Sequence, residues 1–224
     1  MSHRTYGQFC GLVRALEVLG ERWALLIVRD LFLGPRRFTD LQRGLPRIAT
    51  NALSARLKEL EQAGVIRRRV IPRPQSGVVY ELTQYGLDLE DGLWRLGLWG
   101  ARSLGGPGPE DILTPEALAL ALRASFRPNA ARRLKASYEL RIGDVVVQAR
   151  VDRGSVRTDI GPLDKPDLVL EAGLEVRGLM AAEVSPSEAL ASGAVKVTGD
   201  PELLERFVEA FHITPGPAKA AAGA

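Results

Sequence analysis

A run of glycine and proline residues divides this chain into two parts. Residues Gly105 to Pro109 read GGPGP, between one helical pattern and the next. Proline removes a backbone N–H and glycine weakens regular structure, so five such residues in succession predict a linker. The length of 224 residues agrees, because a typical domain has about 100 to 150 residues. We predict two domains, 1–104 and 114–214, with a linker at 105–113 and a C-terminal tail at 215–224 (PGPAKAAAGA).

The two parts carry opposite net charge. Residues 1–108 hold 16 Arg and Lys against 10 Asp and Glu, a net +6, whereas residues 109–224 hold 14 against 17, a net −3. Only five of the 30 basic residues are lysines. The planar guanidinium of arginine suits bidentate recognition of phosphate and of guanine. A genome rich in arginine codons accounts for part of the excess, but not for the difference in sign, so the first part is predicted to face nucleic acid.

The composition excludes several functional classes. One cysteine and two histidines, which lie near opposite ends of the chain, give no cluster at metal-ligand spacing and no Ser-His-Asp arrangement. No glycine-rich phosphate-binding motif occurs either. We therefore expect no metal, no cofactor and no enzymatic activity. There is no run of about 18 apolar residues, and Met1 to Cys10 lack the apolar stretch of a secretory signal. A cytoplasmic chain without a membrane partner is expected.

The first part repeats apolar residues at three- and four-residue steps, the spacing of amphipathic helices. Such helices are predicted at 12–19 and 23–31, then at 38–45 and 49–63, after which Gly64 is suited to a left-handed C-terminal cap. Two β-rich runs, 65–70 and 78–82, flank a Pro- and Gly-containing loop and predict a hairpin. A last helix is predicted at 84–104. Two helices joined by a short turn and followed by a hairpin describe a winged helix-turn-helix, whose second helix enters the major groove of DNA.

Several stretches of the first part resemble the HxlR family of bacterial transcription regulators. They are RALEVLGERWALLIVRDLFLGPRRFTDLQRGLPRIATNALSARLKELEQAGVIRRRV, with YELTQYGLDL and LGLWG downstream. The resemblance implies a regulator that binds duplex DNA, with a dimer interface built from the N-terminal helix and the last helix of this domain. A cysteine near the N-terminus, here Cys10, is also typical of the family, although Gly11 stands where proline often follows.

The exposed face of helix 49–63 holds the predicted base contacts. Leu53, Leu57 and Leu60 recur on the buried face, which leaves polar side chains near the helix start exposed. As an alternative role for Thr50 and Asn51, their side-chain oxygen atoms satisfy free backbone N–H groups of the first turn. Thr50, Asn51 and Ser54 are predicted to read base edges, with Asn51 suited to adenine, and Lys58 is predicted to meet phosphate.

Arginines lie before and after this helix in the sequence. Three of them open the predicted wing, where strand geometry sends Arg68 to the face opposite its two neighbours. A charge run is ordinarily a solvated face, but beside a recognition helix it also neutralises phosphate. The predicted phosphate contacts are Arg36, Arg37, Arg47, Arg67, Arg68, Arg69 and Arg73, with Arg43 extending the patch, whereas Arg22 and Arg56 are expected to pair with Glu21 and Glu59.

The last helix of the first part predicts a homodimer. One recognition helix makes few base contacts, so specificity normally comes from a dimer that reads two half-sites about 34 Å apart. Segment 84–104 has more apolar surface than one small domain covers, and Gly92, Gly97 and Gly100 permit close approach of a second helix. We therefore expect a homodimer on a pseudo-palindromic operator.

The second part has the pattern of an α+β domain. Thr114 and Pro115 start a helix that runs to about residue 126. β-rich runs at 136–142, 145–152, 155–160 and 167–171 are predicted to form an antiparallel sheet, with turns at Gly143-Asp144 and Arg153-Gly154. Short helices are predicted at 175–183 and 186–192, a strand at 194–198 and a final helix at 201–211. The aspartates between 159 and 167 lie among glycine and proline and predict a solvated loop, not a calcium site.

The stretch PDLVLEAGLEVRGLMAAEVSPSEALASGAVKVTGDPELLERFVEAF resembles the sterol-carrier-protein-like fold, above all at SGAVKVTGD and the leucine-rich helix after it. The resemblance implies a sheet layered with helices that enclose an apolar tunnel for a hydrophobic ligand, such as a fatty-acyl, sterol-like or polyketide molecule. The candidate lining residues are Val146, Leu168, Leu170, Leu179, Met180 and Phe207, with core packing as the alternative role for each.

Two further hypotheses stay open. The chain could sense oxidants through Cys10, which requires an exposed thiol with a lowered pKa, and a buried or inert thiol is the other interpretation. The chain could also be a carrier of lipid or another hydrophobic ligand, in which the winged helix makes protein contacts. Indifference to duplex DNA would favour the carrier.

Overall fold

The structure is a computed structural model that describes residues 5–74, 76–104, 108 and 110–214. Contacts divide the chain into two compact units, the first ending at Leu93 and the second starting at Trp94. Residues 105–107 and 109 of the predicted linker, and the whole predicted tail, lie outside the described residues. The domain limits at 104 and 114 therefore stay a prediction.

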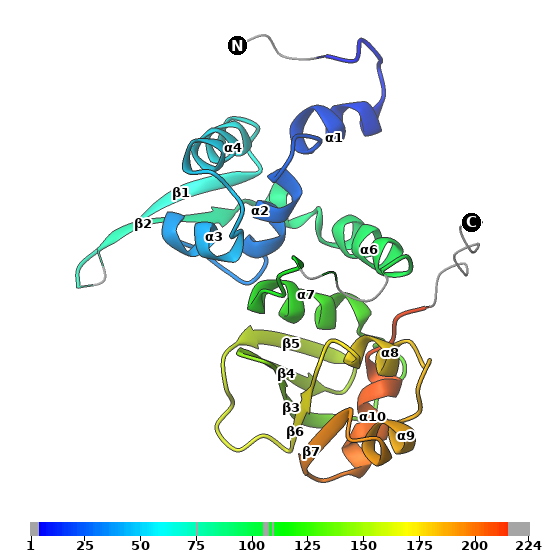
Figure 1. Cartoon of the computed structure of the whole chain (residues 1–224). Helices are drawn as coiled ribbons and strands as arrows, with labels where there is room; N and C mark the ends of the chain where they lie inside the picture. The colour runs from blue at the N-terminus through cyan, green and yellow to red at the C-terminus, as the bar shows by residue number, and fades with distance from the viewer. Residues whose placement is uncertain (1–4, 75, 105–107, 109, 215–224) are drawn as a thin grey trace. The chain divides into compact units, whose positions relative to one another are not determined.

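The first unit is a set of helices with a two-stranded wing (Figure 1). Its helices are α1 (Gly11–Leu19), α2 (Ala24–Leu31), α3 (Phe38–Gly44) and α4 (Thr50–Gln62), of which α3 and α4 form the predicted helix-turn-helix. Their apolar faces make the core, in which Ile27, Val28, Leu41, Leu53, Leu57 and Leu60 are buried. Gly64 has φ +73°, so it takes the predicted left-handed conformation directly after α4.

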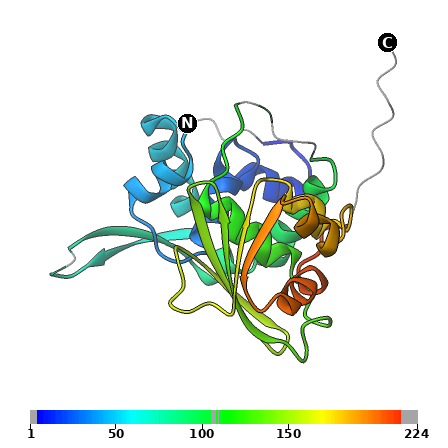
Figure 2. The same cartoon turned by 60° about the horizontal axis from the view of Figure 1, so that its bottom comes forward.

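The wing is an antiparallel hairpin of β1 (Ile66–Ile71) and β2 (Gly77–Leu82), in which Ile66 lies opposite Leu82. It extends away from the helices of its unit (Figure 2). The segment before α3 adds one bridge to it. The N–H of Arg36 donates to the carbonyl of Tyr80 at 2.9 Å, and the N–H of Tyr80 donates to the carbonyl of Arg36 at 2.8 Å. This bridge holds the wing beside the start of α3.

The prediction of one helix over 84–104 is wrong. The structure has α5 (Gln84–Leu87) and α6 (Glu90–Ala101), separated by a turn in which the Leu89 N–H donates to the carbonyl of Gly86 at 3.3 Å. A tertiary contact places the first of these helices. The hydroxyl of Thr83 accepts the Gly86 N–H at 3.2 Å and donates to the carbonyl of Gly64 at 2.6 Å. The spacing of apolar residues within 84–104 gives no information about this contact with Gly64.

The second unit is built on a five-stranded sheet with the order β5-β4-β3-β6-β7 (Figures 1 and 2). Its strands are β3 (Lys135–Ile142), β4 (Val145–Asp152), β5 (Ser155–Ile160), β6 (Leu168–Ala172) and β7 (Val195–Gly199), all close to the predicted runs. The prediction of an antiparallel sheet is wrong at one pair, because β3 and β6 are parallel. The connection 161–167 crosses from the edge strand β5 to the far side of β3, which no tight turn can do.

Helices of the second unit cover the sheet. α7 (Pro115–Ser125) packs on β4 and β5, and α9 (Pro186–Ala191) packs on β7 and against α10 (Glu202–Ala210). The short α8 (Val176–Met180) lies between β6 and α9 in the sequence. An aromatic cluster fills the core, with ring centroids of Tyr138 and Phe207 at 5.4 Å and those of Phe207 and Phe211 at 4.8 Å.

Candidate nucleic-acid interface

The exposed face of α4 carries the predicted base-reading side chains. Leu53, Leu57 and Leu60 are buried, and the four polar residues predicted to face DNA are all exposed. Helical spacing separates the two sets because residues three and four apart share a face. These exposed residues are Thr50, Asn51, Ser54 and Lys58.

Hydrogen bonds orient the first turn of this helix. Thr50 Oγ1 accepts from Nε2 of Gln42 on α3 at 2.9 Å, so the two helices of the motif are joined at this point. Asn51 Oδ1 accepts the backbone N–H of Ala52 at 2.8 Å, and Ser54 Oγ donates to the carbonyl of Thr50 at 2.9 Å. The side chain of Asn51 thus satisfies one free N–H of the helix start, as the alternative interpretation held, while its amide group stays at the surface.

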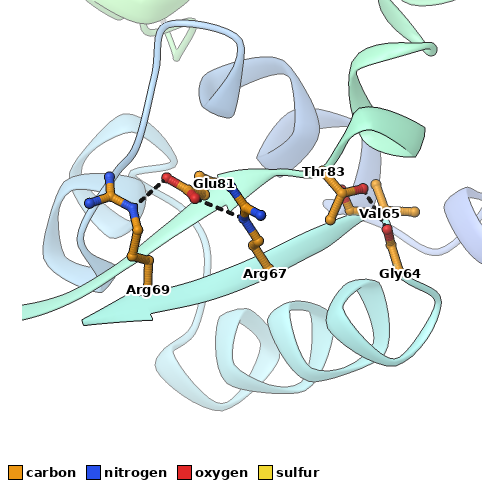
Figure 3. Close-up of polar contacts among 6 residues, drawn as sticks. All are labelled: Gly64, Val65, Arg67, Arg69, Glu81 and Thr83. Carbon is orange, nitrogen blue, oxygen red and sulfur yellow. Dashed lines mark hydrogen bonds and ion pairs between the residues drawn. The ribbon is translucent and has the colours of Figure 1, made fainter. Parts of the chain in front are cut away.

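A carboxylate in the wing connects two of the predicted phosphate contacts (Figure 3). Glu81 accepts from Nε of Arg67 and from Nε of Arg69, each at 2.8 Å and each on a different oxygen. Glu81 lies opposite Arg67 in the register of the hairpin, and Arg69 is two residues along the same strand face. These bonds use only Nε, which leaves the η nitrogens of both guanidiniums at the surface.

The two arginines lower the pKa of the Glu81 carboxyl, Arg69 more than Arg67, because their hydrogen bonds and charge favour the ionised form. The Glu81 side chain is 13% exposed, whereas that of Arg67 is 67% exposed. The carboxylate is therefore shielded and the guanidinium projects outward. Arg68 is exposed as well and, by strand alternation, points to the other face of the wing.

The other predicted phosphate contacts differ in exposure. Arg47 and Arg73 are exposed. Arg37 is also exposed and donates from an η nitrogen to the carbonyl of Ser76 at 3.3 Å, which joins the start of α3 to the wing. Arg36 is only half-buried, and its Nε is buried without a hydrogen-bond partner among the described residues. The backbone bridge to Tyr80 holds Arg36 in this position, so it is the least suited of the set to reach a phosphate.

Three other arginines of the unit, Arg22, Arg43 and Arg56, contact side chains of the protein. Arg56 pairs with Glu59 at 2.5 Å, as predicted, and also lies 3.8 Å from Glu21, the residue predicted to pair with Arg22. Arg22 lies over the ring of Trp23, 4.9 Å from its centroid. Arg43, which was expected to extend the patch, is exposed and lies 3.6 Å from Asp40. The sequence analysis did not predict that Glu81 holds Arg67 and Arg69. Its position in the short strand predicted to pair with the three arginines could have indicated this.

The predicted ligand-lining residues of the second unit do not all share one side of the sheet. Leu168, Leu170, Leu179, Met180 and Phe207 are buried. Val146 lies opposite Arg141 in the β3–β4 register, on the face that carries the ion pairs of Arg141 with Glu139 (2.6 Å) and Glu171 (3.1 Å). Side chains alternate along a strand, so Val147 and Ala149 are the core residues of β4, and Val146 does not belong with the other five.

A surface hollow of about 640 Å³ lies elsewhere in the second unit. Its lining is made by Phe126, Arg127, Pro128, Asn129, Ala130 and Glu209, none of which is a predicted lining residue. Across the described residues, no three His, Cys, Asp or Glu side chains are grouped so that they could hold a metal ion. In the same part of the chain no helix has the length and apolar character needed to cross a membrane.

Cys10 stands at the N-cap of α1, and its thiol is exposed. The backbone N–H groups of Val13 and Leu12, at the open end of the helix, lower the pKa of this thiol. A free N–H at a helix start stabilises the thiolate over the thiol.

A helix-turn-helix, a polar face at the start of its second helix and an arginine-rich wing define the class of winged helix-turn-helix proteins. Residues 18–106 match the family described as HxlR-like helix-turn-helix. The chain belongs to this family. It is similar to the uncharacterized HTH-type transcriptional regulator YvaP of Bacillus subtilis (strain 168), with 40% identity over 86 residues that make up 38% of this chain and 80% of YvaP.

Further relatives cover the same half of the chain. The HTH-type transcriptional regulator YodB of B. subtilis (strain 168) is 38% identical over 85 residues, which are 38% of this chain and 76% of YodB. The solved structure of the reduced form of YodB has 32% sequence identity to this chain and a TM-score of 0.39. The match covers 45% of this chain and 100% of the YodB chain. The relatives are transcription regulators and not enzymes, so this chain is a member of a non-enzymatic, DNA-binding family.

Proposed function

We propose that the chain regulates transcription by binding a pseudo-palindromic operator as a homodimer. The observation that carries the proposal is the surface formed by the start of α4 and the wing. Thr50, Asn51 and Ser54 are exposed at the end of the helix that reaches base edges in this motif. The η nitrogens of Arg67 and Arg69 supply the phosphate contacts, with their guanidiniums held by Glu81.

The apolar residues of α1 and α6 support the homodimer. Neither helix has a buried residue, although both carry large apolar side chains. Leu12 is 70% exposed on α1 and Trp99 is 68% exposed on α6. Exposed apolar patches of this kind mark protein–protein interfaces. A two-fold dimer through these helices presents two copies of α4 to two half-sites.

Salt-dependent binding to duplex DNA tests the proposal. We expect the full chain to bind a duplex selected from a random pool, with an affinity that falls as salt rises because phosphate contacts release counterions. Changing Arg67, Arg68 and Arg69 to Gln should weaken binding strongly. The slope of log K against the logarithm of the salt concentration should become shallower by about 0.9 for each phosphate that is no longer bound. The matched control changes Arg177, Lys196 and Arg206 of the second unit to Gln. Indifference of the unmodified chain to DNA would overturn the proposal and favour a lipid carrier.

We also propose that the second unit controls DNA binding by taking up a hydrophobic ligand. The proposal rests on the resemblance of this part of the sequence to the sterol-carrier-protein-like fold. Its candidate lining residues Leu168, Leu170, Leu179, Met180 and Phe207 are buried, as both a ligand tunnel and core packing require. Control requires the ligand to bind the DNA-competent and incompetent states with different affinity, a coupling of about 1 to 3 kcal/mol. Titration with medium-chain and polycyclic apolar compounds tests it, because unchanged operator affinity at saturating ligand would remove the sensor role and leave DNA binding intact.

A thiol switch at Cys10 is a second candidate for control. Its exposed thiol with a lowered pKa at the start of α1 favours it, since α1 belongs to the proposed dimer interface. Oxidant should then change DNA affinity of the natural chain but not of a Cys10→Ser variant. An equal response of both proteins would exclude the switch.

A further inference from the structure

Six basic side chains gather at one end of the sheet in the second unit. They come from the segment before β3, from the adjoining strand ends and from the β4–β5 turn, and all are exposed. The Arg153 N–H donates to the Leu134 carbonyl at 2.8 Å, and a Cβ on Gly154 would lie 3.2 Å from the Pro128 carbonyl oxygen. The turn thus rests on the segment before β3. We name Arg132, Arg133, Lys135, Arg150, Arg153 and Arg157 the turn cluster.

The turn cluster is poorly neutralised compared with the rest of its unit. Three arginines elsewhere in the unit are paired, Arg141 with Glu139 at 2.6 Å, Arg177 with Glu183 at 2.8 Å and Arg206 with Glu209 at 2.5 Å. Within the cluster Arg157 bonds Asp159 at 3.0 Å, and the other five members have no ion pair with any described residue. Asp152, in register with Lys135, is the one carboxylate on the strand segments that carry the cluster besides Asp159. Asp167 and Asp200 lie at the same end of the sheet, where the Asp167 carboxylate accepts from the Ser137 N–H at 2.7 Å. The six basic side chains of the turn cluster outnumber these four carboxylates, in a half whose net charge is −3.

Two members of the cluster face each other directly. Arg150 on β4 lies opposite Arg157 on β5 in the antiparallel register. Like charges at directly opposite positions destabilise a sheet by up to about 1 kcal/mol, so this pair does not serve the stability of the unit. An anion placed between the two guanidiniums would turn the repulsion into attraction.

The turn holds a third arginine in an unfavourable backbone conformation. Arg153 has φ +46°, in the left-handed region that costs a side chain with a Cβ about 1 to 2 kcal/mol. The other hairpin of the same sheet places Gly143 at the corresponding φ of +57°, without that cost. An arginine at this turn therefore adds charge at the expense of stability, as residues at binding sites do.

We propose that the turn cluster is a second contact to the phosphate backbone of the DNA that the first unit binds. The inference rests on the proposed function. A duplex held by one unit is present at high effective concentration for the other, so even weak contacts add to the overall affinity. Guanidinium groups bind phosphate oxygens bidentately, which fits a cluster with five arginines among its six members. The contact reads no sequence and adds affinity and salt dependence only.

Binding of the full chain to an extended duplex tests this contact. The DNA is a selected duplex of about 20 base pairs, enough for two half-sites one helical turn apart, and the same duplex lengthened on both sides. The cluster variant is Arg132→Gln, Arg133→Gln, Arg153→Asn, in which Asn suits the left-handed turn and so protects the fold. The control variant Arg177→Gln, Lys196→Gln, Arg206→Gln removes equal charge from the same unit.

We expect the cluster variant to bind the extended duplex more weakly than the control variant, with a salt slope shallower by about 0.9 for each phosphate that the cluster no longer neutralises. Circular dichroism should show both variants folded. A cluster variant that binds the extended duplex as the control does overturns the inference. Failure of the unmodified chain to bind either duplex overturns the proposed function itself. This result differs from equal binding by the two variants, which overturns only the role of the turn cluster.

Discussion

Arg67 and Glu81 lie directly opposite each other in the wing, and their side chains are joined by a 2.8 Å bond from Nε to Oε1. Arg69 bonds the other carboxylate oxygen at the same distance. One shielded carboxylate thus sets the direction of two exposed guanidiniums. An arginine side chain loses much rotamer freedom when it binds phosphate, and an arginine that is already held loses less.

The Glu81 bonds should make the stability of the first unit pH-dependent. The folded-state pKa of Glu81 is lowered below its unfolded value of about 4.3. Its contribution is therefore present above that pH and is lost as pH falls through the folded-state pKa. We expect Glu81→Gln to lower the thermal midpoint at neutral pH, and the difference from the natural chain to shrink in acid. Thermal melts across that range measure it, and a difference that does not change with pH would contradict the prediction.

Asn51→Ala should cost specific DNA affinity. A bidentate contact from Asn to adenine contributes about 1 to 3 kcal/mol of discrimination, which is roughly 5- to 150-fold in affinity. Fluorescence anisotropy on the selected duplex and on an unrelated one measures the loss, which should appear only with the selected duplex. Gln62→Ala, at the other end of α4, is the matched control. Equal weakening on both duplexes would mean that Asn51 does not read a base.

Charges on the exposed apolar faces of α1 and α6 should separate the dimer. Leu12→Asp and Trp99→Glu each place a carboxylate in the proposed interface, where its desolvation is unfavourable. Sedimentation velocity should then show monomers, while circular dichroism should show an intact fold because neither side chain is buried. Leu190→Asp, which changes a 37% exposed leucine on α9, should leave the association unchanged. Dimers in both interface variants would place the interface elsewhere.

Tyr138→Phe should leave the second unit as stable or make it more stable. The Tyr138 side chain is fully buried, and its hydroxyl has no hydrogen-bond partner among the described residues. Burial raises the pKa of this hydroxyl well above its usual range. Removing an unsatisfied buried hydroxyl relieves a desolvation cost of about 1 kcal/mol or more. Chemical denaturation measures the change, and a clear loss of stability in the variant would contradict the prediction.

Local patterns predicted most of the elements. Apolar spacing located α1 to α4, and glycine chemistry located the end of α4 and the β3–β4 turn, because each depends on a few neighbouring residues. The break between α5 and α6 was missed, and the position of α5 was not predictable from local pattern because Thr83 at its start bonds the carbonyl of Gly64, which is 19 residues away. The parallel pairing of β3 with β6 was missed for the same reason, since a long connection has no local signature.

The sequence by itself determined that the chain has a winged helix-turn-helix with an exposed polar helix start and an arginine-rich wing. Only the tertiary structure decided how those charges are arranged. It placed Glu81 between Arg67 and Arg69, turned Arg36 inward beside Tyr80, and brought Arg153 to the segment that precedes β3. Charge can be counted along a chain, but whether it is paired depends on strand register and on contacts between distant segments, which exist only after folding.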